Sequence, residues 1–210
     1  QHYSECFEGL DNLANVYESK KNKIAVIGHS RGIGKAICDL YRKKKYNVVG
    51  MSKSNGFDLV HDQEKILEEM QDCSLVVLNA HSDRGQLTLL KKIYGRHSFD
   101  KMKVAVITST SGIEEEPDYN QFQIWDKFKY VQYCVIKKEL IEYIDELQEE
   151  LMSKPLSVYD VCPDVVDTDM TKGVWENLPK LTAEEVADAV RYCFESTFNV
   201  NKIVIQKNAR

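Results

Sequence analysis

The sequence predicts a single α/β domain in which a doubly wound, central parallel sheet is flanked by helices. Short runs of apolar, β-branched residues alternate along the chain with segments whose apolar residues recur at helical spacing. The run at 74–80 is almost continuously apolar, as expected of a parallel strand buried on both faces. No internal repeat or linker divides the 210 residues. We therefore assign 23–210 to one domain and 1–22 to an N-terminal extension with a short amphipathic helix.

Composition narrows the possible partners. The net charge is −5 and the pI about 5.6, so no overall basic field favours nucleic acid or an anionic membrane. The apolar runs are too short to span a bilayer, and no signal peptide is recognisable. Six dispersed cysteines form no Cys-x-x-Cys pair, and the histidines show no metal-binding spacing. We expect a cytoplasmic protein without a metal site, a nucleic-acid partner or a membrane partner.

The first strand predicts the ligand. An apolar run at 24–27 ends at Gly28, passes Gly32 and Gly34, and continues into a helical segment at 36–41. Glycines permit positive φ and let the backbone approach a pyrophosphate, whose charge then lies at the free N–H groups of the helix start. The pattern predicts a dinucleotide held by a Rossmann-like strand, turn and helix.

Two alternatives compete with this interpretation. A P-loop would need a glycine where His29 stands and a hydroxyl residue where Ala36 stands, although Gly34-Lys35 resembles its end. A glycine-rich turn without any ligand is the second alternative. The spacing Gly-x-x-x-Gly-x-Gly, with Ser30-Arg31-Gly32-Ile33-Gly34 inside it, resembles the cofactor turn of the short-chain dehydrogenase/reductase family. This resemblance implies cofactor contacts from Gly28, Ser30, Arg31, Gly32, Ile33 and Gly34.

The second strand, at 46–51, indicates which dinucleotide is bound. In a doubly wound sheet its end meets the adenosine ribose, where a carboxylate would bind the 2′-hydroxyl of NAD and a cation the 2′-phosphate of NADP. Ser52 and Lys53 follow this strand, and Arg31 adds a second cation. NADP is therefore favoured over NAD. The alternative is that both cations are merely solvated surface charges.

The segment 56–59 is interpreted as the end of a third strand, where the family resemblance implies that Asp58 holds the adenine. A helix is expected at 61–70, and the strand at 74–80 ends in Asn79-Ala80-His81. That end resembles the family's Asn-Asn-Ala-Gly and implies cofactor contacts from Asn79 and Ala80. Leu78 and His81 replace the first Asn and the Gly.

A crossover helix at 85–96 leads into the next strand, at 103–108. The family places a catalytic Asn on this helix, where it positions a water that relays protons. The segment contains no Asn, and Ser82 or Asp83 lies nearest to its position. We expect an altered relay.

The candidate catalytic residues follow this strand. Its end resembles the family's catalytic serine segment, which implies Ser109, with Ser111 as the alternative. Tyr133 and Lys137 form a Tyr-x-x-x-Lys pair on one helix face, where an ammonium favours the phenolate. Tyr130 has no lysine four positions on. In the mechanism that the resemblance implies, Tyr133 exchanges the proton of the substrate oxygen, Ser109 hydrogen-bonds that oxygen, and Lys137 also holds the nicotinamide ribose.

The same helix has a plausible alternative role. Tyr133 and the apolar residues that follow it at helical spacing would also serve as a core or subunit-interface stripe, and the resemblance implies a homo-oligomer. Ser109 and Tyr133 lie 24 positions apart, more than is usual in the family. The acidic and aromatic insertion at 113–125 could shape the substrate pocket, contact another subunit, or be a plain surface loop.

The last third supplies the remaining strands. The strand at 156–161 runs into a segment that resembles the family's Pro-Gly-x-Val-x-Thr-x-Met, with Asp164 replacing the Gly. The resemblance implies nicotinamide and diphosphate contacts from Val166 and Thr168, and Trp175 could cover the pocket. Thr182 and Glu185 predict a capping box at the start of a helix that runs to about residue 196. The last strand is expected at 200–205.

Together these motifs predict an NADP-dependent oxidoreductase that interconverts a carbonyl and an alcohol on a small molecule. The alternative is a non-catalytic NAD(P)-binding sensor or interaction protein on the same fold. The departures at Leu78, His81 and Asp164 favour the alternative. The joint presence of Ser109 and the Tyr133/Lys137 pair, each on the element that the fold requires, favours the enzyme.

Overall fold

The computed structural model describes residues 22–114 and 127–208. Its strands are all parallel, with bounds β1 Lys23–Ile27, β2 Asn47–Met51, β3 Leu75–Leu78, β4 Lys103–Ile107, β5 Ser157–Pro163 and β6 Lys202–Ile205. Its helices are α2 Gly32–Lys43, α3 Gln63–Met70, α4 Gly85–His97, α5 Lys127–Leu151 and α6 Ala183–Glu195. Short 3-10 turns follow three strands, with bounds η1 Lys53–Asn55, η2 Thr110–Gly112 and η4 Asp169–Thr171.

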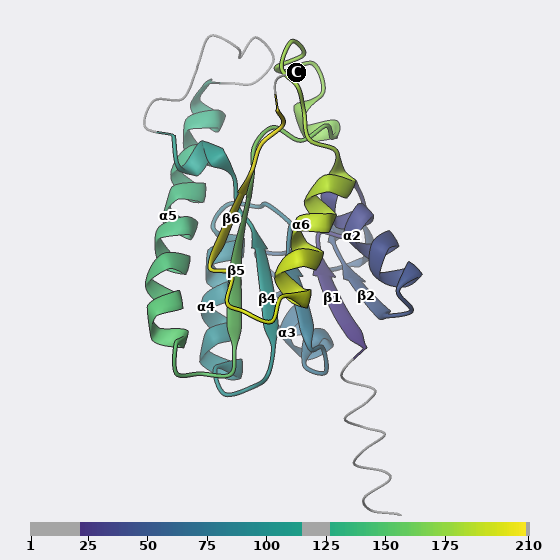
Figure 1. Ribbon diagram of the computed structural model, residues 1–210, viewed down its shortest axis with the longest axis vertical. Coiled ribbons are helices and arrows are strands. Elements are labelled where there is room, and N and C mark those ends of the chain that lie inside the picture. The colour runs from purple at the N-terminus through teal and green to yellow at the C-terminus, as the bar shows by residue number, and fades with distance from the viewer. Residues whose placement is uncertain (1–21, 115–126, 209–210) are drawn as a thin grey trace, which may run out of the picture.

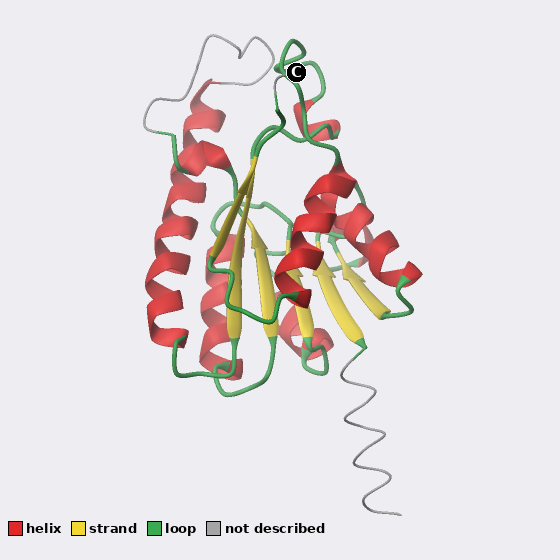
Figure 2. Cartoon of the chain, in the orientation of Figure 1, coloured by secondary structure: helices red, strands yellow, loops and turns green. Residues whose placement is uncertain are grey.

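The sheet order is β2-β1-β3-β4-β5-β6, so the chain winds outward from β1 in both directions. Figure 2 shows the strand arrows pointing to one common edge. This arrangement confirms the predicted doubly wound α/β fold. Ligands of such sheets bind outside the carboxyl ends of the strands, at the point where the winding reverses, which here is beside β1.

The predicted third strand at 56–59 is wrong. After η1 the chain turns directly into α3, and β2 is left as an edge strand of the sheet. Asp58 causes this turn, because its Oδ1 accepts hydrogen bonds from the N–H groups of Val60, at 2.8 Å, and His61, at 3.3 Å. The connection from β2 to α3 is also too short to hold the crossover that another parallel strand would need.

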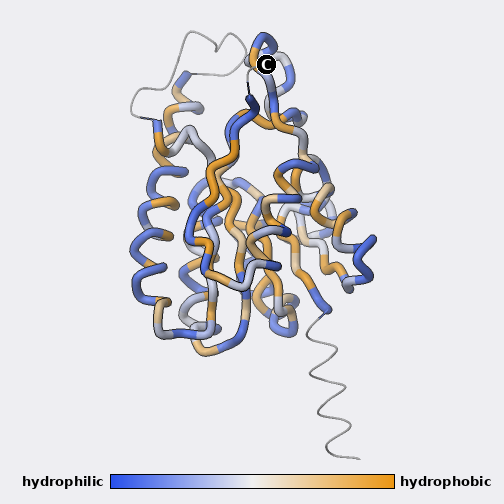
Figure 3. The backbone as a smooth tube through the Cα atoms, in the orientation of Figure 1, coloured by the Kyte–Doolittle hydropathy of each residue, from blue (hydrophilic) through white to orange (hydrophobic). Residues whose placement is uncertain are grey.

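The sheet separates two apolar cores (Figure 1). Alternate strand residues point to opposite faces: Ala25 and Ile27 join the core beneath α3, α4 and α5, whereas Ile24 and Val26 join the core beneath α2 and α6. Figure 3 shows the strands as mostly hydrophobic segments, with amphipathic helices on both sides of the sheet. Burial on both faces explains why the strands appear in the sequence as nearly continuous apolar runs.

Two predicted features lie outside the described residues, namely the helix within 1–22 and most of the insertion at 113–125. Within the described ranges, no helix is long and apolar enough to cross a membrane.

Candidate functional site

The glycine turn packs its backbone more closely than any side chain would permit. Gly28 has φ +91°, and a Cβ built on it would lie 2.6 Å from the backbone nitrogen of Ala80. A Cβ on Gly34 would lie 2.0 Å from the carbonyl oxygen of Gly28. Asn79 closes the contact, since its Nδ2 donates to the Gly28 oxygen at 2.9 Å. The predicted residues Asn79 and Ala80 therefore brace the turn from the end of β3.

The N-terminus of α2 suits an anion. Arg31 occupies the N-cap position without a side-chain cap, and the first turn contains no acidic residue. Gly32 has φ +50° and lies against Thr168, whose Cγ2 would be 3.1 Å from a Cβ built on that glycine. The structure thus brings together the glycine turn and a residue predicted from a distant motif. This close-packed, uncapped turn fits the pyrophosphate of a dinucleotide.

Ser30 and Arg31 are exposed in the turn, whereas Ile33 packs partly into the core beneath α2 and α6. At the end of β2, the Nζ of Lys53 forms an ion pair with Oδ2 of Asp58 at 3.0 Å. The backbone hydrogen bond from Val60, followed by the Lys53 contact, lowers the pKa of Asp58 to about 2. The two residues predicted to hold separate parts of adenosine therefore contact each other.

Ser109 and Tyr133 come together at the end of β4. Ser109 caps η2, where its side chain accepts a hydrogen bond from the N–H of Ser111, and it lies near enough to the phenol of Tyr133 on α5 to lower the pKa of that residue. Burial raises the pKa of Tyr133 to about 12, against the opposing effect of the Ser109 side chain. The phenol of this partly buried residue is consequently protonated at neutral pH.

Lys137 lies one helical turn farther along α5, with Nζ 5.6 Å from the centre of the Tyr133 ring. Its side chain is buried, and Nζ donates to Gln86 Oε1 at 2.8 Å and to the Ile107 oxygen at 2.9 Å. Burial lowers its pKa to about 7. The sequence prediction missed Gln86 as a member of this cluster.

Helical spacing could have located Gln86. It lies three, four and seven positions before Leu89, Leu90 and Ile93, on the buried face of α4. A glutamine on an apolar face must satisfy its amide inside the protein. Ser82 and Asp83, the residues expected nearest to the position of the family's catalytic Asn, precede α4 rather than lying on it, and Asp83 is exposed.

A second Ser–Tyr pair lies beside the first. The hydroxyls of Ser111 and Tyr130 are 3.1 Å apart, and the ring of Tyr130 stacks on that of Tyr133 with 6.4 Å between centres. Trp175 meets Tyr130 edge-on, with 5.9 Å between ring centres. Only the pair with Tyr133 has the lysine one turn on, so the structure favours Ser109 over Ser111.

His81 fills the position where the motif comparison expects glycine. Its ring meets Tyr133 edge-on, with 4.9 Å between ring centres. Its buried Nδ1 has no hydrogen-bond partner among the residues that the structure describes. Burial, and secondarily the charge of Lys137, lowers the pKa of His81 to about 4, so the imidazole is neutral at physiological pH.

The loop after β5 holds the other predicted cofactor residues. Val166 is buried beneath α6 and forms an isolated bridge with Leu181, and its carbonyl oxygen accepts from Thr171 Oγ1 at 2.5 Å. Asp164 accepts a hydrogen bond from Thr110 Oγ1 at 3.1 Å, which ties this loop to η2 beside the candidate catalytic residues.

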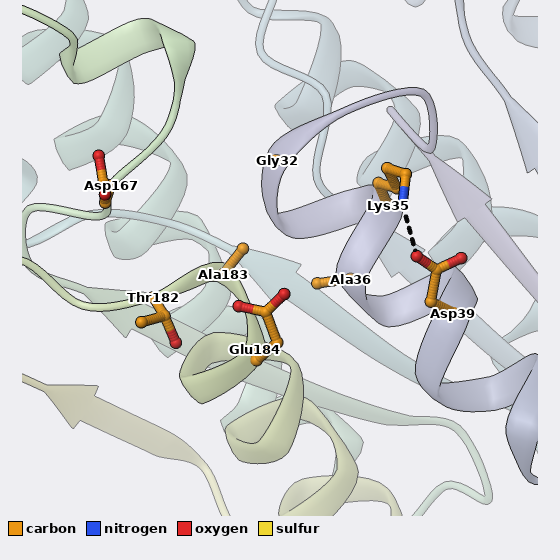
Figure 4. A pocket seen from close by; sticks show the side chains of 8 residues that line it. All are labelled: Gly32, Lys35, Ala36, Asp39, Asp167, Thr182, Ala183 and Glu184. Atoms are coloured by element: carbon orange, nitrogen blue, oxygen red, sulfur yellow. Dashed lines mark hydrogen bonds and ion pairs between the residues drawn. The ribbon is translucent and has the colours of Figure 1, made fainter.

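A pocket of about 340 Å³ lies between α2 and α6. Figure 4 shows Gly32 and Lys35 on one side and Thr182 and Glu184 on the other. Its lining includes three carboxylates and one ammonium, and that ammonium, on Lys35, is already paired with Asp39 at 2.7 Å. The phosphates of a dinucleotide would be repelled there, so this pocket is not the cofactor site.

No protein-family model and no curated protein sequence matches the chain. Solved structures do match. A short-chain dehydrogenase/reductase from Vibrio parahaemolyticus superposes with a TM-score of 0.70 at 18% identity, covering 89% of this chain and 100% of the other. A short-chain dehydrogenase from Burkholderia cenocepacia J2315, in complex with NADP, gives 0.70 at 15% identity, with 88% of each chain covered.

A third structure, 4-hydroxyisoleucine dehydrogenase complexed with NADH, gives a TM-score of 0.69 at 16% identity and covers 88% of this chain and 96% of the other. At such identities the likeness is one of fold. The predicted resemblance to the short-chain dehydrogenase/reductase family is therefore confirmed in the fold that these proteins share.

Proposed function

We propose that this chain is an NADP-dependent oxidoreductase that interconverts a carbonyl and an alcohol by hydride transfer. One observation carries the proposal: Tyr133 lies beside Ser109 and has Lys137 one turn away, at the sheet edge that also holds the glycine turn. The similar structures include named dehydrogenases with NADP or NADH bound. A nicotinamide dinucleotide supplies or accepts the hydride when it is bound.

Each residue then has a distinct role. Tyr133, protonated at neutral pH, donates its phenolic proton to the oxygen of the reduced carbonyl, while Ser109 hydrogen-bonds the same oxygen. The ammonium form of Lys137 stabilises the phenolate that remains, and its unused N–H is available to a ribose hydroxyl. The raised pKa of Tyr133 suits the reduction direction, because alcohol oxidation would need the phenolate first.

Charge and hydroxyl groups support NADP over NAD. Arg31 is exposed at the glycine turn, and Lys53 follows β2 with its side chain largely exposed. The hydroxyls of Ser52 and Ser54 lie 2.8 Å apart on either side of Lys53. Such a set of cations and hydroxyls suits a 2′-phosphate, and a phosphate would compete with Asp58 for the ammonium of Lys53.

The test compares the wild type with Tyr133→Phe. We expect both to bind NADPH, followed by its fluorescence, more tightly than NADH, and only the wild type to oxidise NADPH with a panel of ketones and aldehydes. Tyr130→Phe is the matched control, since it removes the neighbouring phenol and should retain turnover. Binding without turnover on any carbonyl would favour the non-catalytic sensor, and absence of binding would overturn both functions.

A further inference from the structure

The environment of Lys137 is more closed than its proposed role requires. The side chain is 2% exposed, and two of the three ammonium hydrogens are directed to acceptors, one on Gln86 and one on Ile107. The nearer acceptor is the Gln86 side chain, at 2.8 Å. Lys137 is thus held directly by a side chain of the crossover helix α4.

Gln86 is itself fixed. It is 3% exposed, and its Nε2 donates to the carbonyl oxygens of Leu78, at 2.8 Å, and Ile107, at 3.1 Å. These carbonyls end β3 and β4, so the amide spans the gap between two parallel strands. Of the two polar atoms of the Gln86 amide, only the nitrogen can donate to these carbonyls, so Oε1 must face the lysine.

We propose that Gln86 is a positioning residue, which holds the amine of Lys137 directly and, by offering it a neutral acceptor, controls how readily that amine takes up a proton. For catalysis this inference rests on the proposed function, since the charge of Lys137 would stabilise the phenolate of Tyr133. On the crossover helix, where we expect an altered relay, the residue that contacts Lys137 is thus a glutamine.

The other titratable groups around Lys137 do not supply a close countercharge. Tyr133 lies on the same helix, and His81 faces the cluster as a neutral imidazole from the end of β3. From β5, Asp160 and Cys162 act on Lys137 only at a distance. Asp160 is occupied elsewhere, by Thr108 Oγ1 at 2.5 Å and by Lys202 at 3.5 Å.

The decisive variant is Gln86→Glu, which puts a carboxylate at the lysine. Protein with ¹³C at the lysine ε-carbons is titrated by NMR without cofactor, and the Lys137 signal is assigned with Lys137→Arg. An opposite charge at hydrogen-bond distance should raise the titration midpoint of the Lys137 signal by about 1–3 pH units. Gln86→Met, which offers no comparable acceptor, should lower it. An unchanged midpoint in the Glu variant would overturn the proposal.

Gln63 provides the matched control. It is another buried glutamine, on α3, and its Nε2 also donates to two carbonyls, those of Leu59 and Gly85, at 3.0 and 3.3 Å. Gln63→Glu should therefore lower stability as Gln86→Glu does, while the midpoint of Lys137 moves far less. Equal shifts from both variants would attribute the effect to buried charge in general and overturn the direct role of Gln86.

Stability provides a second readout, which does not depend on finding a substrate. The pKa of Lys137 is about 7 in the folded protein and 10.5 in its ordinary state, so the unfolded chain binds more protons between these values. The free energy of unfolding should rise with pH across this window, and Gln86→Glu should flatten the rise. A slope equal to that of the wild type would contradict the proposal.

The outcomes separate this inference from the proposed function. If no carbonyl is turned over but the titration midpoint of Lys137 moves, the proposed role of Gln86 is supported and the proposed oxidoreductase function is not. If turnover is found, the pH profile of kcat/KM should move with the NMR midpoint in Gln86→Glu and stay in place in Gln63→Glu. If turnover is found but neither the pH profile of kcat/KM nor the titration midpoint of Lys137 moves in Gln86→Glu, the oxidoreductase function is supported and the role of Gln86 is refuted.

Discussion

Helices α2 and α6 pack on the same face of the sheet, yet their N-terminal ends are built in opposite ways. α6 caps itself: Thr182 Oγ1 accepts from the N–H of Glu185 at 3.1 Å, and Glu185 Oε2 accepts from the N–H of Thr182 at 2.8 Å. α2 follows Arg31, which gives no side-chain cap, and its first turn has no acidic residue.

The difference separates structure from function at two similar positions. The first N–H groups of any helix lack intrahelical partners. α6 satisfies these groups with its own side chains and adds Glu184 in its first turn, whereas α2 leaves them available beside a close-packed glycine turn. Figure 4 shows the carboxylate of Glu184 on the α6 side of the pocket between the two helices, which is not the cofactor site. We infer that one terminus only stabilises the fold and that the other is reserved for an anionic ligand.

Gly34→Ala should have the largest effect, because it breaks the α2 turn itself. The new Cβ would lie 2.0 Å from the Gly28 oxygen, a backbone atom that cannot move without displacing the end of β1. We expect a loss of about 3 kcal/mol in the free energy of unfolding, measured in urea, together with loss of NADPH binding. Gly95→Ala on α4 is the control: its Cβ meets open space and should stabilise by up to about 1 kcal/mol. A Gly34→Ala variant as stable as the wild type would contradict the close packing.

Arg31→Ser should make α2 resemble α6. A serine at this extended N-cap position can accept a hydrogen bond from an N–H group of the first helical turn. We therefore expect the free energy of unfolding of Arg31→Ser to exceed that of Arg31→Ala by about 1 kcal/mol. Both variants remove a cation, and NADPH affinity should fall by roughly tenfold or more in each, as measured by fluorescence titration. NADPH affinity that is unchanged in both would refute a role for Arg31 at the 2′-phosphate.

The N-terminal ends of α2 and α6 also show which parts of the structure could be predicted from the sequence. Thr182 and Glu185 formed the expected capping box, because a cap is decided by residues three positions apart. The glycine turn was equally local, and continuous apolar runs located all six strands of the described sheet. The strand predicted at 56–59 is absent because the side chain of Asp58 accepts backbone hydrogen bonds that form a turn there.

The candidate site was harder to predict, since its contacts join elements that are distant in sequence. Gln86 and Lys137 are 51 positions apart, and nothing in either segment alone indicates that they are hydrogen-bonded. The pairing of Lys53 with Asp58 was missed for a different reason. The family resemblance assigns each residue to the cofactor separately. The two side chains carry opposite charges and form an ion pair with each other.

Thr182→Ala gives the smallest effect and the clearest separation of the two termini. Removing the Oγ1 acceptor should lower the free energy of unfolding by about 1 kcal/mol in urea, since the N–H of Glu185 loses its partner. NADPH affinity should be unchanged, because this cap belongs to the helix that only stabilises the fold. Glu185→Gln retains an acceptor for the N–H of Thr182 and loses only the charge, along with its ion pair to Lys207, so it should cost a few tenths of a kcal/mol. Weaker NADPH binding in Thr182→Ala would mean that both termini serve the ligand, and the contrast between α2 and α6 would then be one of degree.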